Sequence, residues 1–213
     1  MAIANGSQTM GLVNSAGDLT YYKRNGKTIS KKKIQANSSR TPAQMLQRSC
    51  FKLAGHLSKR FYEVIMKGFA STKYVSSAFN SFVRLNIQHI TATYDEKSEK
   101  YIASIDYTRL QCADGDLFPP ELTATIEQEN AKIVVTVNEP IPGGRYNPDD
   151  KIYLVIYEKV QELCLMHELC ARTEVGDVEI LIPQRWDTEA MELYAFASSN
   201  KGKMSSPSIY LKH

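Results

Sequence analysis

Ile152-Tyr153-Leu154-Val155-Ile156-Tyr157 is the most strand-like stretch of the chain, because its residues are β-branched or aromatic apart from one Leu. Six further runs of this character surround it, about 10 to 15 residues apart, with turn residues between them. They are residues 122–126, 133–137, 163–172, 178–182, 191–197 and 208–211. Regular spacing of short strands is typical of two antiparallel sheets packed face to face, so we predict a C-terminal β-sandwich.

Alternation within these runs indicates which side of each strand is covered. Met191-Glu192-Leu193-Tyr194-Ala195-Phe196 alternates in the way expected of a strand with one packed face and one solvated face. Asp114-Gly115 and Pro119-Pro120 mark a boundary before the strands. We therefore expect residues 115–213 to fold alone as an all-β unit.

The N-terminal part of the chain has a different character. Residues 1–17 are rich in Gly, Ser and Asn and have few charges, so we expect an extended arm rather than a packed element. Asn25-Gly26 separates two strand-like runs, 19–24 and 27–30, and this dipeptide favours a two-residue hairpin. An isolated hairpin is marginally stable in water, so we expect this one to lie against another surface.

A helical region follows the hairpin. Thr41-Pro42-Ala43-Gln44 combines an N-cap residue, a Pro at the first helical position and a capping-box Gln. Two apolar stripes follow, and they predict two or three helices that end before a strand at residues 90–94. The stripes are Leu46, Cys50, Leu53, Leu57 and Phe61, then Tyr74, Ala78, Phe79, Phe82 and Leu85. We divide the chain into an arm and hairpin (1–40), a helical region (41–95) and the β-sandwich (96–213).

Charge is distributed unevenly along the 213 residues, although the whole chain has a net charge of only +3. Residues 1–90 hold 14 Lys and Arg against 2 Asp and Glu, and residues 91–213 hold 12 against 21. The halves therefore carry +12 and −9. Such asymmetry indicates either a basic half that meets an acidic partner, two halves that complement each other, or an ordinary solvated basic face.

Catalytic and metal-binding motifs are missing from the sequence. It contains no GxSxG, GxxxxGK[ST], HExxH or GxGxxG pattern, and its four His residues are scattered. The four Cys residues have no CxxC spacing, which favours buried free thiols. On one predicted strand Cys164, Met166, Glu168 and Cys170 share a face and His167 lies on the other, so a mixed Cys/His metal site is geometrically awkward.

Two further candidates have structural interpretations beside the functional ones. Asp149-Asp150 suits either a calcium-binding loop or a solvated turn at a strand start, and the turn is favoured. Trp186 suits either a ligand platform or a packing residue at the end of the sandwich, and packing is favoured. We predict no catalytic residues, no metal site and no cofactor.

Two resemblances can be named. The C-terminal strands resemble the later strands of a fibronectin type III or immunoglobulin-like module. The resemblance rests on Tyr157, Tyr194-Ala-Phe196, the turn at residues 200–202 and the closing residues 206–211. The Trp expected in that module's second strand is absent from residues 133–137. The resemblance implies an antiparallel immunoglobulin/fibronectin-like β-sandwich. Together with the N-terminal patterns, it leads us to predict an α+β chain in which a basic arm, a β-hairpin and helices precede that sandwich.

The second resemblance covers nearly the whole chain. It rests on the start of the chain, the hairpin, the helix cap and the closing segments. These are residues 1–6, the hairpin with Tyr22 and Gly26-Lys27, the 41–44 cap with Gln47-Arg48, and residues 194–196 and 206–211. They are similar to an uncharacterised domain-of-unknown-function family of gut-dwelling Gram-negative bacteria and their mobile elements. This family implies no activity, and basic-hairpin-plus-helix starts among phage-like proteins suggest a virion role.

Three functional hypotheses remain. The favoured one is a non-enzymatic structural or interaction protein, including a virion or mobile-element assembly component, that docks on itself or on another protein. The alternative is a nucleic-acid-binding protein, and an enzyme or sugar-binding module with a site in the sandwich loops is the third. The partner-binding residues predicted in the first two cases are Tyr21, Tyr22, Lys23, Arg24, Lys27, Lys31, Lys32 and Lys33.

The sequence also gives expectations about the location of the protein and its association with other copies. No run reaches the ~18 apolar residues of a membrane span, and the N-terminus lacks the features of a signal peptide, so we expect no membrane partner and a cytoplasmic or virion location. The hairpin is covered either by the helix of residues 42–61 in the same chain or by another copy. The +12 and −9 halves favour head-to-tail contact between copies.

Overall fold

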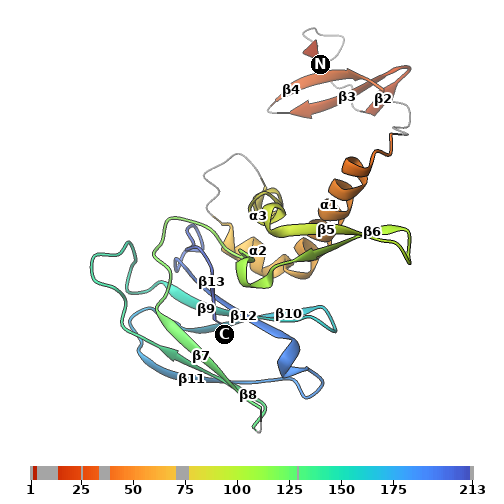
Figure 1. The fold of residues 1–213 in the computed structure, drawn as a ribbon. Coiled ribbons are helices and arrows are strands. Elements are labelled where there is room, and N and C mark those ends of the chain that lie inside the picture. The colour runs from red at the N-terminus through yellow and green to blue at the C-terminus, as the bar shows by residue number, and fades with distance from the viewer. Residues whose placement is uncertain are drawn as a thin grey trace. The chain divides into compact units, whose positions relative to one another are not determined.

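A computed structural model describes residues 2–3, 14–24, 26–33, 39–70, 77–128 and 130–211. In these ranges the chain is a mixed α+β protein with three α-helices and several antiparallel sheets (Figure 1). It groups into two compact units, residues 1–41 and residues 42–213. The predicted mixed α+β class is confirmed. The three-part division at residues 40 and 95 stays a prediction.

The first unit is a small antiparallel sheet. Its strands are β1 (Ala2–Ile3), β2 (Asn14–Ala16), β3 (Leu19–Arg24) and β4 (Lys27–Lys32), in the order β1-β4-β3-β2. β3 and β4 pair from Leu19↔Lys32 to Arg24↔Lys27, which leaves a two-residue connection as predicted. Gly26 has φ +73°, a backbone conformation that favours glycine and that this turn requires. Asn25 and most of the predicted arm lie outside the described residues.

Helices open the second unit. α1 (Pro42–Arg60) begins directly after Thr41, as the cap motif predicts, and α2 (Tyr62–Gly68) and α3 (Ala78–Asn86) follow. The Ser77 hydroxyl caps α3 by accepting a hydrogen bond from the Asn80 N–H. A hairpin of β5 (Ile90–Asp95) and β6 (Lys100–Ile105) lies against α1, where Cys50, Ala54 and Ile90 form a small buried cluster.

Two antiparallel sheets make up the rest of the second unit. One has the order β11-β8-β7 and the other β10-β9-β12-β13. Apolar side chains from both sheets meet in one buried cluster, which includes Val135 of β8, Leu154 of β9 and Leu193 of β12. The strands are β7 (Leu122–Glu127), β8 (Lys132–Val137), β9 (Lys151–Glu158), β10 (Leu163–Ala171), β11 (Gly176–Leu181), β12 (Met191–Ser198) and β13 (Ile209–Tyr210).

The four-stranded sheet is covered on both faces. Tyr157 and Tyr194 point away from the three-stranded sheet and join a second cluster with Phe61 and Phe82 of the helical part. The Phe61 ring centroid lies 4.9 Å from that of Tyr157 and 6.4 Å from that of Tyr194. Every residue of β12 is buried. The prediction that β12 has one solvated face is therefore wrong, because the helices occupy that face.

A β-bulge changes the faces of β10. The pairing register between β10 and β9 shifts between Glu168 and Cys170. Cys164 and Met166 pack on the helix side of the sheet, whereas Cys170 packs on the side of the three-stranded sheet. The prediction that Cys164 and Cys170 share a face is wrong, because the extra residue reverses the alternation after Glu168.

Candidate functional site

The predicted partner-binding residues lie on β3 and β4 or directly after them, and the pairing divides them between two faces. Opposite residues of a ladder share a face, and successive residues alternate. One face therefore carries Tyr22 and Ile29, with Arg24 opposite Lys27 and Lys31 opposite Thr20. The other face carries Tyr21, Lys23 and Lys32, and Lys33 follows the end of β4.

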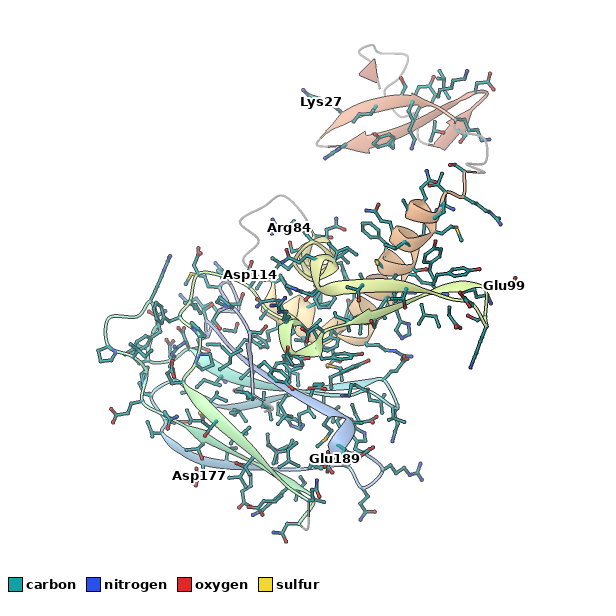
Figure 2. The ribbon with its side chains drawn as sticks, viewed as in Figure 1. Lys27, Arg84, Glu99, Asp114, Asp177 and Glu189 are labelled. Carbon is teal, nitrogen blue, oxygen red and sulfur yellow. The ribbon has the colours of Figure 1, made fainter. Side chains whose placement is uncertain are left out.

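Tyr22 lies at the centre of the more basic face. The Lys31 ammonium lies 5.8 Å from the centroid of the Tyr22 ring, within the range of a cation–π contact. Arg24 and Lys27 are exposed on the same face (Figure 2 labels Lys27). The sheet thus offers an aromatic ring with cations around it, an arrangement suited to an anionic partner.

No residue of this sheet whose burial the structure describes, between residues 15 and 33, is buried. Tyr21, Tyr22 and Ile29 are half-buried, and Lys23, Arg24 and all the lysines of the sheet are exposed. These positions hold six Lys and Arg against a single acid, Asp18. The first unit is therefore a cationic sheet without a hydrophobic core of its own in the described residues.

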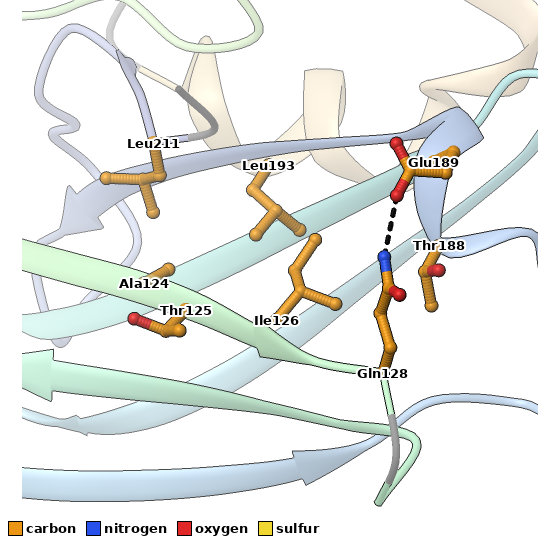
Figure 3. A pocket seen from close by; sticks show the side chains of 8 residues that line it. All are labelled: Ala124, Thr125, Ile126, Gln128, Thr188, Glu189, Leu193 and Leu211. Carbon is orange, nitrogen blue, oxygen red and sulfur yellow. Dashed lines mark hydrogen bonds between the residues drawn. The ribbon is translucent and has the colours of Figure 1, made fainter.

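A groove lies between the two sheets of the second unit, with a volume of about 320 Å³ (Figure 3). Ala124 and Ile126 of β7 face Leu193 of β12 and Leu211 across its apolar floor. Its polar rim includes Thr125 and the short turn η4 (Thr188–Ala190). The Gln128 side chain donates a hydrogen bond to the Glu189 carboxylate at 2.6 Å and closes one end.

Sequence reasoning did not find this groove. The pattern of Leu122–Ile126 predicts a strand, but the position of this strand at a sheet edge depends on how distant strands pair. Two features of the sequence agree with the observed position. β7 contains no charged residue before Glu127, and Pro119-Pro120 precedes it.

Buried acids elsewhere in the second unit are bonded internally. Glu192 accepts hydrogen bonds from the Lys159 ammonium at 2.5 Å and from the Tyr210 hydroxyl at 2.6 Å. Burial, and then the hydrogen bond to Glu192, raises the pKa of Tyr210 above its ordinary value. Glu158 accepts from the N–H groups of Val160 and Gln161, and so orders the turn after β9. These acids serve the fold.

The remaining sequence candidates also have structural surroundings. Asp150 is fully buried and accepts hydrogen bonds from the backbone and side chain of Asn147 at 2.8 and 3.4 Å, so the prediction that this acid lies in a solvated turn is wrong. Trp186 packs against the cluster between the two sheets, as predicted. In the described ranges no three His, Cys, Asp or Glu residues are arranged to hold a metal ion.

A protein-family model matches most of the chain. The model of a family of unknown function, DUF6266, matches residues 19–212. The chain belongs to this family. The match begins at β3 and includes the β3–β4 hairpin of the cationic sheet and the groove between the sheets, whereas β1 and β2 precede it. The expected membership of a family of unknown function is confirmed.

Two further findings are negative. No curated protein matches the chain significantly. Within the part of the chain that the structure describes, no helix combines the length and apolar character needed to cross a membrane.

Proposed function

We propose that this member of the DUF6266 family is a non-enzymatic interaction protein that docks through its cationic N-terminal sheet onto an acidic protein surface. One observation carries the proposal: the described part of this four-stranded sheet has no buried residue and six basic side chains. A sheet normally needs a covered apolar face to be stable. Docking would cover Tyr22 and Ile29 and neutralise the lysines around them.

The charge of the chain supports a second copy as the partner. Residues 91–213 carry a net −9, opposite to the basic sheet. Complementary charge speeds encounter and sets orientation, and contact between different surfaces of identical copies builds rings or open arrays. A structural role in an assembly, including a virion or mobile-element assembly in gut bacteria, is the biological form of this proposal.

We further propose that β7–β13 form a fibronectin type III/immunoglobulin-like sandwich that acts as a rigid block. Two features support it: seven consecutive antiparallel strands, and their division into sheets ordered β11-β8-β7 and β10-β9-β12-β13. If β7 to β13 are lettered A to G in chain order, the three-stranded sheet has the order E-B-A and the four-stranded sheet has the order D-C-F-G. A fourth strand added to the C-F-G sheet is a known variation of this architecture.

Nucleic acid is the second candidate partner. Tyr22 has Arg24, Lys27 and Lys31 on its own face. Proteins that bind single-stranded nucleic acid combine aromatic platforms with a positively charged surface that follows the phosphates. This arrangement is the specific observation in favour of the alternative.

Light scattering coupled to size-exclusion chromatography tests the proposal on the full chain. We expect self-association at about 0.05 M NaCl that is lost at about 0.5 M, because salt screens exposed charges. The double variant Lys27→Glu/Lys31→Glu should abolish it. The matched variant Lys23→Glu/Lys32→Glu changes the same charge on the opposite face and should have a smaller effect.

The same runs with a labelled single-stranded DNA of about 20 nucleotides separate the candidates. Salt-sensitive co-elution with DNA, lost in the Lys27→Glu/Lys31→Glu variant, would support the nucleic-acid alternative. A monomer at every salt concentration that also fails to bind DNA would contradict both.

A further inference from the structure

The free edges of the two packed sheets differ in how well they are protected. β10 is interrupted by its bulge, and β13 has only two residues. β11 carries Asp177 and Glu179 on its exposed face. Bulges, short strands and charges are the usual devices that prevent other strands from pairing at an edge. β7 has none of them along Leu122–Ile126 and pairs with β8 through six uninterrupted positions.

Hydrogen bonds around β7 fix which backbone groups point to its free edge. The Asn138 N–H donates to the Glu121 carbonyl, so Glu121 is a residue whose polar backbone groups face β8. These groups alternate in direction along an antiparallel strand, so those of Thr123 and Thr125 also face β8. Leu122, Ala124 and Ile126 therefore direct theirs away from β8. Within the described ranges no hydrogen-bond partner lies on that side.

The groove continues this edge. The backbone groups of Ala124 and Ile126 point to the free edge, and their side chains form part of the apolar floor of the groove. Leu193 and Leu211 form the rest of that floor. Thr125, Gln128 and Glu189 form a polar rim with one acidic group. A segment that binds here would have to be an extended strand, with unpaired N–H and C=O groups at every second residue. Its apolar side chains would lie on one face and its polar or basic side chains on the other.

We propose that β7 and the adjoining groove bind an extended segment of a partner protein, which adds to the β11-β8-β7 sheet as a fourth strand. Main-chain hydrogen bonds to Ala124 and Ile126 hold the segment, and an apolar side chain at every second position enters the groove. Basic residues flanking the segment face Glu189. This site is separate from the N-terminal sheet and goes beyond the function proposed for that sheet.

The probe is a fluorescein-labelled synthetic peptide, Lys-Val-Thr-Val-Thr-Val-Lys, titrated against the full chain. Its control has the same side chains but carries N-methyl groups on the three valines, so it cannot form the ladder on that edge. We expect saturable binding of the first peptide and at least about tenfold weaker binding of the second. Equal binding of the two, or no binding of either up to about 1 mM, overturns the proposal.

Variants locate the site. Ala124→Pro removes the outward N–H while leaving the β8 ladder intact, and it should weaken binding about tenfold or more. Ala124→Lys places a charge at the groove and should do the same. The control Thr123→Lys puts that charge on the outer face of the same strand and should leave affinity within about twofold.

Hydrogen exchange on the unaltered chain provides a readout independent of folding defects. The peptide should slow exchange of the Ala124 and Ile126 amides. Protection confined to another strand overturns the assignment. The assignment also fails if the peptide leaves these two amides unprotected and the chain instead dimerises with rising concentration through an edge that Ala124→Pro disrupts. Lys27→Glu/Lys31→Glu should leave peptide binding unchanged, so a failure of the N-terminal docking function is distinguishable from a failure here.

Discussion

The N-terminal sheet and the central β10-β9-β12-β13 sheet each have four strands, yet they differ in what covers them. Every residue of β12 is buried, between helices on one face and a second sheet on the other. In the N-terminal sheet none of the residues whose burial is described is buried. The comparison shows that pairing register and stability have separate origins. A good turn sets the register of β3 and β4, whereas covering layers supply the stability of β9 and β12.

The largest expected effect comes from removing one covering layer. Residues 115–213 alone should fail to fold, because Tyr153, Tyr157, Tyr194 and Phe196 would lose the helices that cover them. At about 1.5–3 kcal/mol for each large apolar side chain, the loss is on the order of 10 kcal/mol, comparable with the stability of a whole domain. Circular dichroism and thermal melting measure it.

This expectation replaces the one drawn from the sequence, in which the same segment folds alone. A cooperative melt of residues 115–213 would restore the earlier prediction and would show that the helices are an attachment to an autonomous sandwich. Residues 42–213, which keep both layers, are the control and should melt cooperatively.

A single side chain of the covering layer should have the next largest effect. Phe61→Ala should destabilise the protein by about 3–5 kcal/mol, because Phe61 is fully buried against the rings of Phe82, Tyr157 and Tyr194. Phe51→Ala is the matched control in α1, since Phe51 is 50% exposed, and should cost less than about 0.5 kcal/mol. Urea denaturation measures both. If both variants lowered the free energy of unfolding by similar amounts, the helices would not pack on the sheet as described.

Loss of a helix cap should have a smaller effect. Thr41 directly precedes α1, so Thr41→Ala should cost about 1 kcal/mol through loss of the cap. Thr41→Ser keeps a hydroxyl and should be close to neutral. Equilibrium unfolding of the two variants is the measurement, and an Ala variant as stable as the Ser variant would mean that the helix starts without this cap.

The smallest effect is expected from removing the uncovered sheet. Residues 1–41 and 42–213 are separate compact units, so deletion of residues 1–33 should change the free energy of unfolding of the remainder by less than about 0.5 kcal/mol. The deletion should nevertheless abolish salt-sensitive self-association. A large drop in melting temperature would indicate that the sheet stabilises its own chain, as in the alternative of cover within one chain.

Local sequence signals predicted much of the secondary structure. Asn25-Gly26 marks a connection whose flanking strands pair in the expected register, and Thr41-Pro42 marks the start of α1. The seven β-rich runs all contain strands. Such signals succeed because a turn, a cap or a strand depends on neighbouring residues.

Features that depend on distant contacts were not predicted. Glu192 gives β12 the pattern of a half-solvated strand, but Lys159 and Tyr210 satisfy its carboxylate inside the protein. The bulge in β10 has no local marker in Leu163–Ala171, and the groove beside β7 exists only because of the strand order. For the eight predicted partner-binding residues, the alternation along β3 and β4 defines the faces, while the identity of the partner depends on another molecule.

The bulge in β10 has a consequence for the chemical reactivity of the thiols. Cys164 and Cys170 belong to the same strand, but the irregularity places a sheet between their sulfur atoms. Burial raises the pKa of the Cys164 thiol well above its ordinary value and that of Cys112, on the same side, to about 12. Thiolates react with alkylating reagents, so we expect these two thiols to react slowly near neutral pH while the helical layer is in place. Their alkylation would report the moment at which the helices leave the sheet, independently of what happens on the side of Cys170.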